Sequence, residues 1–247
     1  FPLIGMVALR LAGTSLSPEL HLGFFYLCAL PSTVSSSIAL TAAARGNVPA
    51  AVFNATLSSL IGVFVTPLWV GLVFKGGGQH MHLGKVIMDL VIWLILPLIA
   101  GQLCRPWLAA WAQRNKPLIH VVDRGTILLI IYTSFCDSIE RGVWWGRGAH
   151  VVVVSLLGAV ALFFLVFFIL QAAGRLCGFN MEDRIAAVFC GSKKSIASGV
   201  PMAQLIFGAD PHIGLILLPL MIYHPMQLII CGVLAGRWAR RDGVVKP

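Results

Sequence analysis

Two adjacent lysines, Lys193 and Lys194, lie in the middle of an apolar segment at residues 185–207. The segment is long enough to cross a bilayer, because about 20 helical residues span the hydrocarbon core. A charged side chain at that depth costs roughly 2.5–3.5 kcal/mol on insertion scales, so the lysines indicate a functional site. Small and polar residues surround them: Gly191, Ser192, Ser195, Ser198 and Gly199.

The residues around the lysines also weaken an α-helix. Gly191, Gly199 and Pro201 are poor residues for a helix interior. Non-helical backbone at membrane depth is tolerated only where protein or a water-lined cavity satisfies its polar groups. We therefore expect a broken helix that lines a polar site. The alternative is a surface loop with solvated lysines, which the apolar residues on both sides disfavour.

A second polar interruption, at residues 31–37, divides the apolar span at residues 21–44. Ser35, Ser36 and Ser37 would offer hydroxyl groups there. The string SIA occurs in both interruptions, at residues 37–39 and 195–197, an odd number of predicted spans apart. Paired broken helices in inverted repeats point to the binding site of a secondary transporter. The two interruptions should therefore face each other near the middle of the membrane.

The composition is that of a multi-pass, all-α integral membrane protein. Of 247 residues, 58% are hydrophobic and 11% are charged, whereas a soluble domain has about 25% charged residues. The net charge of +9 comes from scattered basic residues, which predicts a lipid bilayer rather than a nucleic acid as the partner. The six cysteines have no C-x-x-C spacing, so no metal site is expected. The oligomeric state is not set by these features.

Eight spans are predicted, at residues 1–13, 21–44, 48–74, 84–108, 118–138, 149–173, 185–207 and 213–236. The string Arg45-Gly46-Asn47 would end the second span, with Gly46 and Asn47 suited to a left-handed cap. If Arg45 is cytoplasmic, eleven basic residues fall on that side and five on the other. The positive-inside rule then predicts a cytoplasmic C-terminus, in a plasma membrane or bacterial inner membrane.

Several strings resemble the bile acid:sodium symporter superfamily, in its symporter-like (SBF-like) branch. They are residues 30–37 (LPSTVSSS), 44–47 (ARGN), 66–67 (TP), 191–195 (GSKKS) with Pro201, and 223–224 (YH). The resemblance covers nearly the whole chain. It implies an inverted-repeat fold in which six core helices include two broken helices that cross, beside four panel helices. It also implies that the N-terminal helices are missing here.

By this resemblance, residues 1–74 form the first core half, residues 75–148 are panel helices and residues 149–247 form the second core half. Sodium-coupled members place an acidic residue and a glutamine where this chain has Phe189 and Lys193. Two hydroxyl ligands correspond to Ala51 and Ala55. A lysine ammonium repels sodium, and it can donate three hydrogen bonds to the same carbonyls. The resemblance therefore implies Lys193 and Lys194 in place of the usual sodium ligands and no cofactor, and it leaves proton coupling open.

The predicted substrate- and ion-binding set contains no catalytic or metal-binding residue. If the interruption at the lysines is helical, the two side chains point about 100° apart. One lysine can then face the cavity while the other pairs with carbonyl groups. The serines, Asn54 and His224 also have a purely structural alternative, as hydrogen-bonding groups between helices. The set is Ser35, Ser36, Ser37, Asn54, Ser58, Ser192, Lys193, Lys194, Ser195, His224 and Gln227.

We interpret the sequence as a secondary transporter of a small organic anion that works by alternating access. Proton-coupled transport, uniport and a non-transporting regulator of ion handling are alternatives within the membrane class. An intramembrane hydrolase with Ser192 or Ser195 beside a lysine is an alternative from the enzyme class. Adjacent residues do not easily form a nucleophile–base hydrogen bond, so we do not expect an enzyme.

Overall fold

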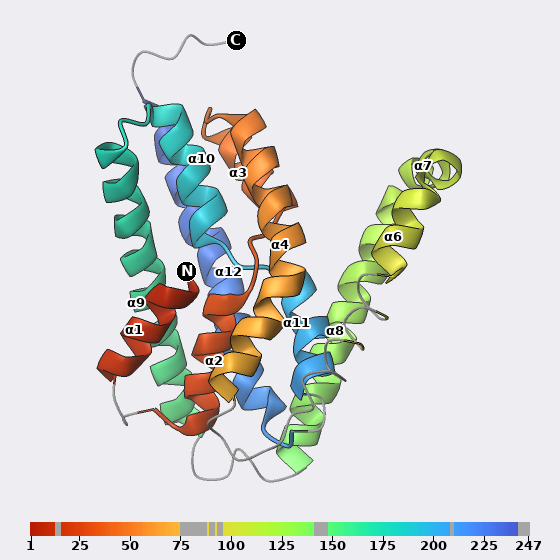
Figure 1. Ribbon diagram of the computed structural model, residues 1–247, viewed down its shortest axis with the longest axis vertical. Coiled ribbons are helices and arrows are strands. Elements are labelled where there is room, and N and C mark those ends of the chain that lie inside the picture. The colour runs from red at the N-terminus through yellow and green to blue at the C-terminus, as the bar shows by residue number, and fades with distance from the viewer. Residues whose placement is uncertain are drawn as a thin grey trace.

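The computed structural model describes residues 1–12, 16–74, 88, 92, 96–140, 148–207 and 210–241. These residues contain α-helices and no β-strand, as the composition predicts (Figure 1). The helices are α1 (Pro2–Ala12), α2 (Pro18–Ala29), α3 (Ser35–Ala43), α4 (Val48–Phe74), α6 (Leu96–Leu103), α7 (Arg105–Arg114), α8 (Lys116–Glu140), α9 (Gly148–Leu176), α10 (Met181–Ser192), α11 (Ile196–Phe207) and α12 (Ile213–Ala239).

Two broken helices lie at the centre of the molecule. Helices α2 and α3 form one and helices α10 and α11 the other, and the two run in opposite directions (Figure 1). The first break starts at Leu30, whose φ of −63° and ψ of 149° are extended, as is typical of a residue before proline. The second starts at Lys193, with φ of −95° and ψ of 148°. Both predicted interruptions are therefore confirmed as breaks.

Three helices among the described residues are long and apolar enough to cross a membrane, α4, α9 and α12. Helix α12 packs against α2, α9 and α3, and α10 packs against α9 and α4. Helices α6, α7 and α8 lie to one side of the bundle (Figure 1), where α8 contacts α11 and α12. The outer face of α4 exposes large apolar side chains, which suits contact with lipid: Val52, Phe53, Leu60, Phe64, Leu68 and Leu72.

The predicted boundaries fail at two places. Part of the span predicted at residues 84–108 lies outside the described residues, and its described part from Leu96 turns at Cys104 instead of continuing to Leu108. Pro106 lies in the first turn of the new helix α7, where proline is tolerated. After α3 the left-handed residue is Arg45, with φ of 55°, and not Gly46 or Asn47.

Helices α2 and α12 approach closely at Gly23. A Cβ atom added there would lie 2.6 Å from the Ile216 carbonyl oxygen and 3.1 Å from Pro219 Cγ. The nearest obstacle is backbone, which cannot rotate away. The absence of a side chain at Gly23 therefore permits the contact that holds the first broken helix against α12.

The substitution Gly23→Ala should lower the stability of the protein by about 1–3 kcal/mol, the usual cost of overpacking. The matched control is Gly232→Ala on α12, because no atom lies within 4 Å of a Cβ added at Gly232. Thermal unfolding of the purified protein in detergent would compare them. Equal unfolding temperatures for the two variants would contradict the packing argument.

Candidate functional site

The two breaks contact each other through direct hydrogen bonds. The Ser195 backbone N–H donates to the Pro31 carbonyl at 3.1 Å. On one side of this contact the Tyr26 hydroxyl donates to the Gly199 carbonyl at 2.6 Å. On the other side the Ser37 hydroxyl donates to the Phe189 carbonyl at 3.2 Å. The prediction that the two interruptions face each other is confirmed.

Lys194 joins the breaks with its ammonium group. Its side chain is buried, and Nζ donates to the Cys28 carbonyl at 2.9 Å and to the Leu30 carbonyl at 2.5 Å. These carbonyls belong to the C-terminal end of α2, where the last four carbonyls have no partner within the helix. The helix dipole makes this end partially negative, so a cation is stabilised there.

Gln227 and His224 reach the same break from α12, as the sequence predicted. Gln227 Oε1 accepts from the Lys194 backbone N–H at 2.7 Å, and its Nε2 donates to the Lys194 carbonyl at 2.8 Å. His224 Nδ1 lies 3.3 Å from the same carbonyl oxygen. The fully buried Gln227 side chain thus replaces the backbone partners that the break removes.

Lys193 has a different environment from Lys194. Its side chain has no exposed surface, and within the described part of the chain Nζ has no hydrogen-bond partner. It lines a cavity of about 460 Å³ together with Lys194, Asn54 and Ser58. Lys193 has an extended backbone, as the expected break requires, so the separation of about 100° in a helical interruption does not apply to the two lysines.

The cavity has one polar and one apolar wall. The polar wall includes Ser32, whose backbone N–H donates to the Ser58 hydroxyl at 3.2 Å. The apolar wall comes from α4 and α9, through Leu57, Ile61, Val65, Val166, Ile169 and Leu170. Such a cavity can hold a small molecule that has an apolar body and a charged end.

The predicted serines of the two breaks are not among the described residues that line the cavity. Ser36 donates to the Thr33 hydroxyl at 2.9 Å, and Ser192 donates to the Val188 carbonyl at 2.6 Å. Ser195 accepts from the Ser198 backbone N–H at 3.3 Å. Ser35 lies exposed in the first turn of α3. The serines whose contacts are described therefore bond to neighbouring backbone or hydroxyl groups.

Sequence reasoning missed two tyrosines that hold the breaks. Tyr26 and Tyr223 are fully buried, and Tyr223 donates to the Ser192 carbonyl at 2.6 Å. A buried phenol must find a hydrogen-bond acceptor, and a break supplies unpaired carbonyls. A tyrosine inside an apolar span was the available signal.

The positions aligned with sodium ligands carry no side-chain oxygen. The buried Phe189 ring packs 5.2 Å from the Trp238 ring, centroid to centroid. Ala51 and Ala55 are fully buried where α4 contacts α10. These side chains fill helix contacts, so their own chemistry does not suit a hard cation that prefers oxygen.

Comparison with known proteins identifies the family of this chain. A family model described as the SBF-like CPA transporter family matches residues 1–240. The chain belongs to this family. It is 46% identical over 245 residues to an uncharacterised protein of Pseudomonas aeruginosa, covering 98% of this chain and 72% of that protein.

Two further relatives have names that describe transporters. The Escherichia coli protein YfeH, named as a candidate symporter, is 43% identical over 249 residues, which cover 98% of this chain and 72% of YfeH. The sodium/bile acid cotransporter 7 of Rattus norvegicus is 32% identical over 225 residues, covering 91% of this chain and 66% of that protein. The SBF-like chain is thus a multi-pass membrane transporter and not an enzyme, and the resemblance in the sequence is confirmed.

The substitution Gln227→Leu should destabilise this SBF-like transporter, because the Lys194 N–H and carbonyl both lose their buried partner. Each unsatisfied group costs about 1–3 kcal/mol. Thermal unfolding in detergent would measure the loss. The control is Gln102→Leu on α6, since Gln102 is exposed. A Gln227→Leu protein as stable as the control would show that the break does not depend on this side chain.

Proposed function

We propose that this transporter carries a small organic anion and that Lys193 binds its anionic group. The supporting observation is the environment of Lys193, which lines a cavity of about 460 Å³ and whose buried ammonium has no hydrogen-bond partner among the described residues. An unpaired buried charge is costly, and a carboxylate or sulfate beside it would offset that cost. Helices α3 and α11 begin at the two breaks, and their partially positive N-termini also favour an anion.

In this proposal, the Lys194 ammonium takes the place of the sodium ion. The alignment assigned that role to Lys193, whereas it is the Lys194 ammonium that contacts the Cys28 and Leu30 carbonyls. Since Phe189, Ala51 and Ala55 offer no side-chain oxygen, we propose that sodium does not drive transport. Proton coupling and uniport are the alternatives that remain within transport.

Alternating access would come from movement of the core relative to the panel. The proposed core halves are residues 1–74 and 149–247, and the proposed panel is residues 75–148. The contacts of α8 with α11 and α12 are the described surface along which the two parts would slide. The basic ends of α3, α7 and α12 would face the cytoplasm, together with the C-terminus.

The substitutions Lys193→Gln and Lys194→Gln should have opposite effects. Lys193→Gln removes an unpaired buried charge, so stability should be kept or raised while affinity for anions falls at least about 30-fold, about 2 kcal/mol or more. Lys194→Gln removes the donor of two buried carbonyls and should cost about 1–3 kcal/mol of stability. Ligand-induced thermal shifts with a panel of carboxylates and sulfates would measure both effects.

The control for this pair is Lys116→Gln, because Lys116 is exposed at the start of α8. It should leave both stability and anion affinity unchanged. If Lys193→Gln keeps full anion affinity, Lys193 is not the anion-binding group and the proposal fails.

Uptake of a bound anion into proteoliposomes should be equal with sodium and with choline outside, at the same ionic strength. The reason is that the aligned sodium positions lack ligand oxygens and that a lysine ammonium already contacts the break carbonyls. An imposed pH gradient then separates proton coupling from uniport. Stimulation by a sodium gradient of more than about tenfold, about 1.4 kcal/mol of coupling, would refute sodium independence.

A further inference from the structure

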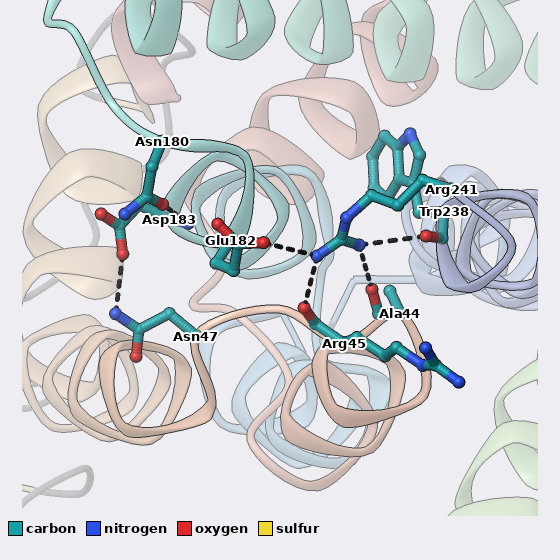
Figure 2. Close-up of polar contacts among 8 residues, drawn as sticks. All are labelled: Ala44, Arg45, Asn47, Asn180, Glu182, Asp183, Trp238 and Arg241. Carbon is teal, nitrogen blue, oxygen red and sulfur yellow. Dashed lines mark hydrogen bonds and ion pairs between the residues drawn. The ribbon is translucent and has the colours of Figure 1, made fainter. Parts of the chain in front are cut away.

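One arginine ties together three chain segments at the end of the molecule where α3 and α12 finish and α10 begins (Figure 2). Arg241 Nη1 donates to the Ala44 carbonyl at 2.6 Å and to the Trp238 carbonyl at 3.0 Å. Its Nη2 donates at 2.7 Å both to the Arg45 carbonyl and to Glu182 Oε1. We call these five residues and their contacts the Arg241 clasp.

A second tie lies beside the clasp and joins two of the same segments, the turn after α3 and the start of α10 (Figure 2). Asn47 Nδ2 donates to Asp183 Oδ1 at 2.7 Å, and its backbone N–H donates to the Glu182 carbonyl at 3.0 Å. Asn47 Oδ1 also accepts from the Ala50 backbone N–H at 3.0 Å and caps α4. The turn between α3 and α4 is thereby fixed to the first turn of α10.

Small residues line the contact of α10 with the α3–α4 turn and with α4, from the clasp toward the break. We call this contact the seam, and its small residues are Gly46, Ala51, Ala186 and Cys190. A Cβ atom added at Gly46 would lie 2.6 Å from Ile185 Cγ2, so the α3–α4 turn touches α10 directly. Ala51 then packs with Ala186, and the Cys190 thiol lies 3.6 Å from the Ala51 carbonyl oxygen. Cys190 also lines the cavity that contains Lys193. The seam therefore separates this cavity from the clasped end of the molecule.

The chemistry of the clasp suits a contact that opens. Its backbone acceptors are carbonyls at the ends of α3 and α12, which water satisfies once the guanidinium leaves. Glu182 is 46% exposed, and the hydrogen bond from Arg241 lowers the pKa of its carboxyl group. Both the closed and the open arrangement can therefore satisfy their polar groups. A single side chain makes all the contacts, so they are lost together.

We propose that the Arg241 clasp is the latch of a gate, and that the cavity opens toward this end only when the clasp releases α10. The proposal rests on the proposed transport function, because a gate needs a cavity that opens alternately. In the clasped state the seam covers Cys190, which is 8% exposed. Release of the clasp leaves the start of α10 held to the α3–α4 turn by Asn47 and no longer by Arg241, so α10 moves from α4 more readily and the Cys190 thiol becomes more reactive.

The test is the rate at which a charged, water-soluble methanethiosulfonate modifies Cys190 in the detergent-solubilised full chain, measured by peptide mass spectrometry. Arg241→Gln should raise this rate about tenfold or more, within the usual range for coupled sites. Glu182→Gln, which spares the carbonyl contacts, should raise it less. The exposed Cys177 is the internal reference, and its rate should stay constant.

Arg240→Gln is the matched control, because Arg240 is exposed and precedes Arg241 at the same helix end. It should leave the Cys190 rate unchanged. If Arg241→Gln does not fold, Arg241→Lys and Glu182→Gln carry the test. An unchanged Cys190 rate in the folded clasp variants overturns the latch, as does an equal rise in Arg240→Gln. A rise confined to the clasp variants, in a protein that moves no anion, keeps the latch and overturns the transport proposal.

Discussion

The crossing of the two broken helices depends on the contact between the Lys194 ammonium and the end of α2. Each break leaves unpaired backbone groups at a depth where water does not replace them. The Lys194 ammonium donates hydrogen bonds to the carbonyls of Cys28 and Leu30. The Gln227 side chain is hydrogen-bonded to the backbone N–H and carbonyl of Lys194 itself. The ammonium charge and the partially negative C-terminal end of α2 attract each other, which lowers the free-energy cost of burying both. The remaining geometry of the site follows from this one pairing.

The two lysines show how backbone conformation gives adjacent identical residues different roles. Lys193 lines the cavity and its ammonium is buried, while the Lys194 ammonium contacts the end of α2. Lys194 is satisfied within the protein, so its charge contributes to the fold. Lys193 is buried without a hydrogen-bond partner in the described residues, so its charge is destabilising unless the proposed anion pairs with it. Such a trade between stability and activity is common at binding sites.

The sequence predicts the presence of the breaks better than their contacts. A charge inside an apolar span has a large energetic cost, and this makes the interruption at Lys193 visible without a structure. The contacts of Tyr26, Gln227 and Lys194 depend on which residues the crossing brings together, and no local pattern contains that information. A helical relation between the two lysines does not apply, because the break makes the Lys193 backbone extended.

Local patterns also mislead at helix ends. A glycine normally marks the left-handed position after a helix, yet Arg45 has the positive φ and Gly46 is needed for close contact with Ile185. The Arg45 carbonyl then accepts from Arg241, almost two hundred residues later in the chain. Tertiary packing has overridden the local preference, as it often does where backbone strain serves another contact.

The fold places permanent and breakable contacts at different depths. At the crossing, the residues Lys194, Gln227 and Tyr223 are buried, so breaking their hydrogen bonds is costly. At the helix ends, Glu182 is close to solvent, so its bond to Arg241 can exchange with water at little cost. Under the proposed function, a core built in this way would move against the panel without changing its centre, with the changes concentrated at its ends. That is the mechanical requirement of alternating access, because the binding site must keep its geometry while its exits open and close.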